Sequence, residues 1–165
     1  WLAGAAQKDI ERALVGFGDE PDAKAIAAAL ASLAARGRSP KTTRELTAVV
    51  GAAKNLEEGW FRKKDAFSSH PAARTFQALR IAVNEERDAL AQLLEDLPFL
   101  MRPGGRAALL TFHSGEEALV EEALRRQMAA GLWREPLAGP RKPLPEEIRE
   151  NPRSRSARLW RVVRV

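Results

Sequence analysis

The sequence predicts an α/β fold, with a doubly wound sheet and a separate helical region. The first observation is the stretch from Pro103 to Ser114, where a Pro-Gly-Gly turn precedes the short apolar run Ala107–Phe112 and Gly115 follows. A short apolar run bounded by glycines is typical of a buried parallel strand. The second observation is that helical patterns flank this run on both sides, the βαβ order of a doubly wound sheet. The third is that residues 1–66 contain only helical patterns.

Three helices are expected in those first residues. Leu2–Val15 carries apolar side chains at helical spacing. Asp22 can cap a second helix over Ala23–Arg36. Thr42 is a good N-cap for a third helix, because Glu45 follows three residues later and completes a capping box.

The segment from Gly51 to Phe67 lacks a strong periodicity and is predicted to be a loop. Its basic and aromatic cluster, Glu57 to Lys64, can contact RNA through stacking. The simpler interpretation, an exposed loop with Trp60 packed into the nearest core, is favoured.

A long helical pattern runs from Ala72 to Met101, with a break expected near Asn84 or Pro98. Its polar positions three and four residues apart share one face: Arg74, Gln77, Arg80 and Asn84. Such a stripe is usually solvated, which is the favoured interpretation, although it can also line a binding cleft.

The remaining elements follow the central strand. We expect a helix over Glu116–Ala129, a strand over Leu132–Leu137 and a proline-rich charged loop over Gly139–Arg155. A helical turn is expected at Pro145–Glu150 inside that loop, and a last strand over Ser156–Val165. Two strands joined by a long loop predict an antiparallel pair at the edge of the sheet.

His113 and Ser114 lie where the central strand ends, and in open α/β sheets ligands bind just beyond the carboxyl ends of the strands. The two residues are not a nucleophile and base pair by themselves, because neighbours on a strand point to opposite faces. Glu116 and Glu117 begin a helix, where carboxylates favour the positive end of the dipole, so capping explains them.

Composition narrows the functional classes. The chain has 165 residues and no cysteine, which excludes disulfides, thiol chemistry and cysteine-ligated zinc. Two histidines argue against a histidine-rich metal site, so no metal is expected. The longest apolar stretch is too short to span a membrane, and with no signal peptide we expect the cytoplasm.

The net charge of +5 is concentrated in the tail. Residues 139–165 contain eight basic and three acidic side chains. Arginine forks suit phosphates, which favours a nucleic-acid contact; a merely solubilising tail is an equal alternative on charge alone.

Five separated blocks carry a resemblance to one family. They are His70-Pro71-Ala72 with the run from Arg74 to Asn84, Pro103 to Arg106, Phe112-His113-Ser114, Lys142-Pro143, and Asn151 to Leu159. Together they resemble the bacterial ribosomal RNA small-subunit methyltransferase H family, also called MraW. The first block is very specific, whereas Pro-Gly-Gly before a strand is common to most methyltransferases.

The resemblance implies the C-terminal part of a Rossmann-like methyltransferase sheet with an inserted all-helical domain. Residues 1–67 would be the inserted, substrate-recognition domain and residues 68–165 the second half of the catalytic domain. The implied reaction transfers a methyl group from S-adenosylmethionine to the N4 amine of a cytosine in small-subunit ribosomal RNA. The family's glycine-rich donor loop and acidic ribose-binding residue have no counterpart in this sequence, so the chain alone is expected to be inactive.

The resemblance also suggests site residues. Asn84, His113 and Ser114 would position the cytosine or help its proton leave, and the base would have to leave its stack. Residues expected to hold RNA are Arg74, Arg80, Lys142, Arg153, Arg155, Ser156 and Arg158. The family usually follows Phe-His-Ser with Leu-Glu-Asp-Arg, where this chain has Gly115, Glu116, Glu117 and Ala118.

The expected partner is small-subunit ribosomal RNA or the ribosomal subunit, without a membrane. A sheet lacking its first strands would expose an unpaired edge, so association, for example as a homodimer, is also expected. Two alternatives remain: a non-catalytic RNA-binding or protein-interaction module derived from such an enzyme, and an α/β domain with no role in nucleic-acid binding.

Overall fold

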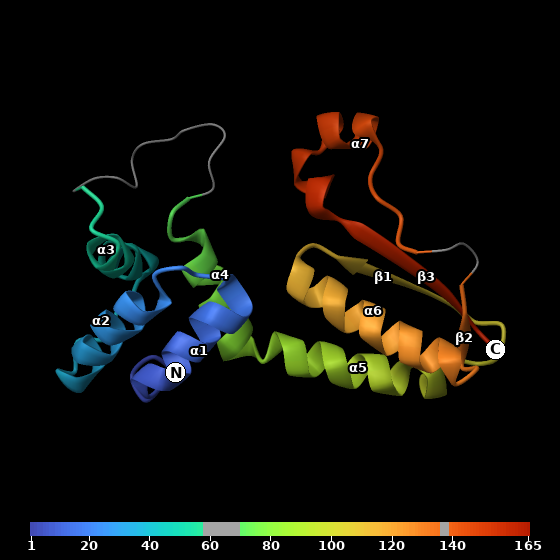
Figure 1. Ribbon diagram of the computed structural model, residues 1–165, viewed down its shortest axis with the longest axis horizontal. Coiled ribbons are helices and arrows are strands. Elements are labelled where there is room, and N and C mark those ends of the chain that lie inside the picture. Colours follow the sequence, from blue (N-terminus) through green and yellow to red (C-terminus); the bar gives the residue numbers. More distant parts are fainter. Residues whose placement is uncertain (58–69, 136–138) are drawn as a thin grey trace. The chain divides into compact units, whose positions relative to one another are not determined.

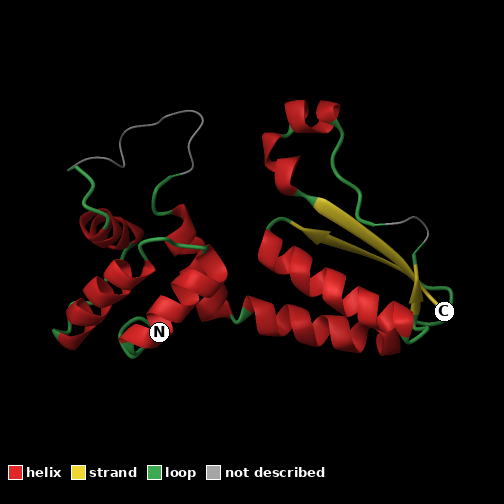
Figure 2. Cartoon of the chain, viewed as in Figure 1, coloured by secondary structure: helices red, strands yellow, loops and turns green. Residues whose placement is uncertain are grey.

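The computed structural model describes residues 1–57, 70–135 and 139–165 (Figures 1 and 2). The chain divides into two compact units, a helical unit, Trp1–Glu86, and a sheet unit, Arg87–Val165. The predicted boundary at residue 67 lies outside the described residues, as does most of the basic and aromatic cluster with Trp60. The assignment of residues 1–67 as an inserted domain therefore stays a prediction.

Four helices make up the described part of the helical unit: α1 (Gln7–Gly18), α2 (Ala23–Ala35), α3 (Thr43–Ala53) and α4 (Ala73–Asn84). The second helix matches its prediction to within a residue, whereas α1 is displaced toward the C-terminus. The predicted loop from Gly51 is wrong at its start, because α3 continues to Ala53. One apolar core joins the four helices, and its fully buried members include Ile10, Leu14, Ile26, Leu30 and Val50.

The helix caps agree with the sequence in one case and not in another. Thr42 Oγ1 accepts the Glu45 N–H at 3.2 Å, and the Glu45 carboxylate accepts the Lys41 N–H at 2.6 Å. The predicted capping box therefore forms, with its carboxylate one residue farther back than usual. Asp22 stands at the N-cap of α2, but its side chain makes no capping bond, so that prediction is wrong.

A buried carboxylate ties the helical unit together. Glu20 follows α1, and its side chain is fully buried. It accepts hydrogen bonds from Lys54 Nζ at 2.5 Å and from Thr75 Oγ1 at 3.0 Å. Because Lys54 caps the end of α3 and Thr75 lies on α4, one carboxylate joins three parts of the unit. Gly18 lies close to α4, where a Cβ atom would approach the Arg74 carbonyl oxygen to 2.6 Å.

The long helical pattern breaks at the first of its two expected positions. Glu85 has a φ of 51° and separates α4 from α5 (Glu86–Leu100). Pro98 does not end the second helix, which continues to Leu100.

The sheet unit contains α5 except its first residue, Glu86, which belongs to the helical unit. The elements that follow are β1 (Arg106–Thr111), α6 (Ser114–Ala129), β2 (Trp133–Arg134), α7 (Pro145–Glu150), a 3₁₀ turn η2 (Pro152–Ser156) and β3 (Arg158–Arg164). The strand order is β1-β3-β2, and both pairs are antiparallel. The predicted antiparallel pair, β2 and β3, is confirmed. The mixed helical and sheet architecture also confirms the predicted α/β class.

The prediction that β1 is a buried parallel strand is wrong for the described residues. The strand pairs only with β3, in antiparallel register from Arg106↔Val163 to Thr111↔Arg158, and lies at one edge of the sheet. Alternate residues are exposed, including Ala108 and Leu110. A run of alanine and leucine predicts that both faces of the strand can be buried. It does not show which other segments of the chain pack on each face.

Helices α5 and α6 lie along the same side of the sheet (Figure 1). Their buried core joins Leu94 and Leu124 to Trp160 and Val162 of β3. Gln127 satisfies two buried polar groups there, because its Nε2 donates to the Leu94 carbonyl at 2.8 Å and its Oε1 accepts from Trp133 Nε1 at 2.7 Å. The opposite side of the sheet, which carries Ala108, Leu110 and Leu159, is called the open face below.

Candidate functional site

The C-terminal end of β1 leads directly into α6 through His113. This residue is the N-cap of α6, and its Nδ1 accepts the Glu116 N–H at 3.3 Å. In return, Glu116 Oε2 accepts the Phe112 N–H at 2.9 Å. Histidine thus replaces the usual serine or threonine of a capping box. The capping interpretation of Glu116 is confirmed, and the carboxylate stands where the family pattern Leu-Glu-Asp-Arg has its glutamate.

This arrangement limits the chemistry of the imidazole. Because Nδ1 accepts a hydrogen bond, the neutral ring carries its proton on Nε2. That Nε2 is buried and lies 3.2 Å from Glu116 Oε1, although without hydrogen-bond alignment to any described residue. Both ring nitrogens of His113 are therefore directed at Glu116, Nδ1 at its N–H and Nε2 toward its carboxylate. Ser114 is the first residue of α6 and is exposed.

The start of β3 is brought to the same end of the sheet. Arg158 is opposite Thr111 in the register, and its Nε lies 3.6 Å from Glu117 Oε1 on α6. Thr111 Oγ1 accepts from Trp160 Nε1 at 3.2 Å and lies 3.4 Å from the Arg158 carbonyl oxygen, to which it donates. The strand register and the contact with Glu117 therefore place Arg158 at the same end of the sheet as His113 and Ser114.

The other predicted RNA-binding residues of the tail precede Arg158. Asn151 begins η2 by accepting the Arg153 N–H at 3.3 Å, and the buried Ser154 donates to the Asn151 carbonyl at 2.8 Å. These bonds fix the turn and leave Arg153, Arg155 and Ser156 exposed. Within the described ranges, neither guanidinium pairs with a carboxylate.

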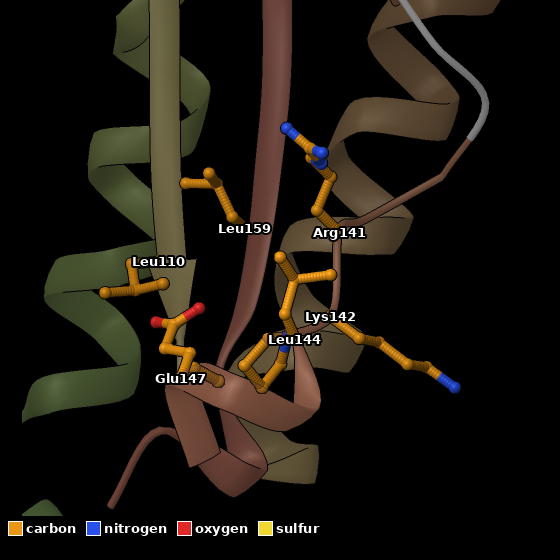
Figure 3. A pocket seen from close by; sticks show the side chains of 8 residues that line it. Leu110, Arg141, Lys142, Leu144, Glu147 and Leu159 are labelled. Carbon is orange, nitrogen blue, oxygen red and sulfur yellow. The ribbon is translucent and has the colours of Figure 1, made fainter. Parts of the chain in front are cut away.

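A cavity of about 260 Å³ lies on the open face near this end. Leu110 and Leu159, which are partners in the register, line it together with Glu147 and the segment from Arg141 to Leu144. Arg141 is fixed by two 2.9 Å backbone hydrogen bonds with Leu159. Figure 3 shows Leu144 among the lining side chains, whereas Lys142 extends away from them. Lys142 therefore contributes its backbone and stem to the cavity and its ammonium group to solvent.

Sequence reasoning missed a set of three arginines farther along the open face. Arg106 on β1 and Arg134 on β2 both pair with Val163, one on each side of β3, and Arg161 is two residues away. With Gly104, Ala107 and Ala108 they line a cavity of about 520 Å³. Arg161 Nε is buried and has no hydrogen-bond partner among the described residues. Only the strand register brings these arginines together, so spacing in the sequence carried no signal.

The predicted site residues of α4 belong to the helical unit and have partners within it. Arg74 Nη1 donates to the Asp19 carbonyl at 2.8 Å. Arg80 Nη2 and Asn84 Nδ2 donate to the two carboxylate oxygens of Glu86, at 2.9 and 3.0 Å. The amide of Asn84 is thereby oriented, with its Oδ1 remaining as an acceptor.

The Pro103–Gly105 turn does not offer free backbone amides to S-adenosylmethionine. The glycine-containing turn Pro103–Gly105 lies at the N-terminal end of β1, away from His113, and its amides are used internally. Gly104 N donates to the Arg164 carbonyl at 2.8 Å and Gly105 N to the Arg102 carbonyl at 2.9 Å. In the part of the chain that the structure describes, no group of three or more His, Cys, Asp or Glu side chains could hold a metal ion.

An ion pair on α6 joins Glu122 and Arg125. On the outer side of α6, the hydrogen bond and charge of Arg125 lower the pKa of Glu122, and Glu122 raises the pKa of Arg125. Both groups are exposed, so this pair marks a solvated helix face.

Among the helices of the described ranges, none has the length and hydropathy needed to cross a membrane.

Curated proteins that share one name are similar to this chain along most of its length. The "ribosomal RNA small subunit methyltransferase H" of Rhodopirellula baltica is 38% identical over 165 residues, covering all of this chain and 48% of that protein. The protein of the same name from Thermomicrobium roseum is 43% identical, with 90% of this chain and 48% of that protein covered. The one from Anaeromyxobacter sp. strain K is 39% identical, with 96% and 54% covered.

The chain thus spans about half the length of the curated relatives it matches. A family model described as the MraW methylase family matches residues 1–165. With this match along the whole chain and a strand–cap–helix end built on Phe112, His113 and Glu116, the chain belongs to the MraW methylase family.

Proposed function

We propose that the protein carrying this chain methylates a cytosine of small-subunit ribosomal RNA at N4, using S-adenosylmethionine, in the cytoplasm. The observation that carries the proposal is the family match over all 165 residues. The names of the relatives support ribosomal RNA as the substrate. The exposed Arg153 and Arg155, which immediately precede β3, support a role of the tail in holding the target strand.

The resemblance supports a division of labour among the residues proposed to act on the acceptor base. The lone pair of an exocyclic amine is delocalised into the ring, so acceptor groups near N4 favour its localisation and receive its proton. Asn84 Oδ1 and Ser114 Oγ are acceptors of this kind. His113 would position the base indirectly, because its Nδ1 accepts the Glu116 N–H and so fixes the junction of β1 and α6 next to Ser114. Positioning dominates such a transfer, because donor sulfur, methyl carbon and amine nitrogen must align.

RNA would be held by the tail and by α4. Arg153, Arg155 and Arg158 would contact phosphates, with Ser156 beside them. Lys142 would contribute a cation at the rim of the 260 Å³ cavity. Arg74 and Arg80 are exposed on α4, although their hydrogen bonds to Asp19 and Glu86 reduce what each has left for RNA. The methyl donor would be bound mainly by residues outside this chain.

The test uses the full-length gene product and small ribosomal subunits that lack the modification. Methyl groups from tritiated S-adenosylmethionine should enter the RNA, and nucleoside mass spectrometry should identify N4-methylcytidine. A product methylated on another atom or base would contradict the proposed specificity. RNA binding without any methyl transfer would favour the alternative of a non-catalytic RNA-binding module.

The roles of His113 and Asn84 need variants that keep the fold. His113→Ala removes the side chain that caps Glu116 N, whereas His113→Asn preserves a capping side chain. We expect the alanine variant to lower kcat by about 100-fold, as a displaced substrate does, and the asparagine variant to restore most of the rate. Asn84→Ala should also lower kcat. Unchanged methylation rates in folded variants would exclude these roles.

Donor binding is tested separately. Titration of the 165-residue chain with S-adenosylmethionine should show no binding.

A further inference from the structure

The turn between α2 and α3 concentrates positive charge. We call residues 36–44 the basic turn. It contains Arg36, Arg38, Lys41 and Arg44, all exposed, and no acidic residue. These are half of the eight basic residues in residues 1–57, a segment that otherwise has more acidic than basic side chains. The charge is therefore local and not a property of the whole helical surface.

The backbone of the basic turn is held at both ends. After α2, Gly37 adopts a φ of 66°, and Arg38 N donates to the Leu33 carbonyl at 2.9 Å. This is the hydrogen bond of a Schellman motif, which needs a glycine at that position. Before α3, the capping box of Thr42 and Glu45 fixes the other end. A turn ordered in advance loses little conformational entropy when a ligand binds.

The four cations of the basic turn have no carboxylate partner among the described residues. Two other cations of the helical unit are paired, Arg12 with Asp9 and Lys54 with Glu20. Glu45 is the acidic residue next to the turn, and its carboxylate is already engaged by the Lys41 N–H. Counting Glu45, residues 36–45 retain a net charge of +3.

A groove of about 520 Å³ adjoins the turn. Its lining combines the apolar side chains of Leu33, Pro40 and Val49 with Arg38 and Lys41. The volume lies within the usual range of small-ligand sites. Aliphatic side chains beside two cations suit a nucleotide, because a base can bury apolar surface against them while its phosphate contacts the cations.

We propose that the basic turn is a phosphate-contacting RNA site of the helical unit; this rests on the proposed function and extends it to a surface separate from the tail arginines. RNA is favoured over an anionic membrane for a physical reason. Membrane-surface segments expose bulky apolar anchors next to their cations. In the basic turn the neighbouring apolar side chains, Leu33 and Val49, are half-buried in the groove.

The test compares two charge-matched double variants of the full-length gene product. Arg38→Gln with Lys41→Gln removes two cations of the basic turn. Lys8→Gln with Lys24→Gln removes two exposed cations of α1 and α2, which have no ion pair among the described residues. Lys24 is one residue from the start of α2 and the basic turn follows its other end, so the control lies about 18 Å away along the helix.

Affinity for a short single-stranded RNA of mixed sequence is measured by fluorescence anisotropy over a range of salt concentrations. Loss of two phosphate contacts should reduce the slope of log K against log salt by about 1.4, and weaken binding roughly 25-fold at about 0.1 M salt. The control pair should stay within about twofold of the parent. On ribosomal subunits the basic-turn variant should raise KM and leave kcat unchanged.

Several outcomes would overturn the proposal. Parent-like RNA affinity of the basic-turn variant, with an unchanged circular dichroism spectrum, would exclude the site. An equal loss in the control pair would show a nonspecific charge effect. Binding to phosphatidylserine vesicles that depends on Arg38 and Lys41, without RNA binding, would assign the turn to membranes.

The two proposals fail in different ways. If the protein methylates ribosomal RNA and the variant keeps its KM, the site is wrong and the enzyme stands. If no methyl group is transferred but RNA affinity depends on the basic turn, the RNA site is supported and the proposed methyltransferase activity is wrong.

Discussion

The two units differ in how they bury their apolar surface. The helical unit encloses its core between four helices, with Ile10, Leu14 and Ile26 fully buried and Glu20 paired inside. The sheet unit packs α5 and α6 on one face of its sheet, while Leu110 on the open face remains 54% exposed. Doubly wound sheets normally have both faces covered by helices.

This difference locates the uncovered apolar surface in the sheet unit. The helical unit has the packing of a self-sufficient domain, whereas the sheet unit presents a half-covered sheet whose edge strand is β1. The proposed chemistry is also at the end of β1. The uncovered apolar surface and the proposed chemistry thus lie in the same unit, in a chain that spans about half the length of its curated relatives.

The largest expected effect is in the enclosed unit. Glu20→Ala would leave Lys54 almost buried without its partner and would remove the acceptor of Thr75. Breaking a buried pair in this way should lower the free energy of unfolding by about 3–5 kcal/mol, as measured by urea denaturation.

The control for Glu20 is a neighbouring exposed carboxylate. Asp22 lies 3.5 Å from the same ammonium group, but its side chain is 47% exposed. Asp22→Ala should change stability by less than about 1 kcal/mol. Equal effects of the two variants would show that Glu20 is not the organising group of the helical unit.

The second prediction compares the two faces of the sheet. Leu94→Ala empties a position that is 1% exposed and should cost about 2–5 kcal/mol. Leu110→Ala, on the open face, should stay within about 0.5 kcal/mol in the 165-residue chain.

The same Leu110 variant should behave differently in the full-length gene product. If further residues cover the open face there, truncation of Leu110 creates a cavity and becomes strongly destabilising. A small effect in both proteins would mean that the open face is a true surface, and the inferred contrast between the units would then be wrong.

A smaller effect is expected at the junction of β1 and α6. His113→Ala removes the side chain that caps Glu116 N and should cost about 1 kcal/mol, whereas His113→Asn should restore most of it. Thermal unfolding followed by circular dichroism measures both. Equal melting temperatures for alanine and asparagine would show that the cap contributes nothing.

The smallest effect is expected on the solvated face of α6. Arg125→Gln should raise the pKa of Glu122 toward its ordinary value, because the hydrogen bond and charge of Arg125 are the main causes of its lowered value. Arg126→Gln should raise it less. Titration of the carboxyl carbon by NMR measures both.

The sign of the pH dependence follows from that shift. A pKa lowered on folding stabilises the protein above the unfolded value, and the contribution is lost as pH falls through the folded value. Since both side chains are largely exposed, we expect no measurable change in melting temperature.

Local signals in the sequence identified most elements. The spacing of Ile26 and Leu30 predicted α2, Thr42 with Glu45 predicted the capped start of α3, and the break after Asn84 is present. Each of these depends on residues within one or two turns of chain. The antiparallel pair of β2 and β3 was also accessible, because alternating strands joined by a long loop form an edge pair.

Features that depend on distant residues were missed. The burial of Glu20 requires Lys54 and Thr75, which are 34 and 55 residues away. The cluster of Arg106, Arg134 and Arg161 requires the strand register. The sequence placed His113 at the end of a strand, but its role as a helix cap required knowing that the strand stops at Thr111.

The unpartnered Nε of Arg161 has a thermodynamic consequence. A buried donor without an acceptor lowers the stability of the state that buries it. Any carboxylate or carbonyl that reaches this atom from a covering segment would bind the folded sheet and not the unfolded chain. By mass action, folding of the sheet and docking of that segment would then be one linked equilibrium. The folded sheet would be more stable when the covering segment is docked, and proteases would cleave it more readily when that segment is absent.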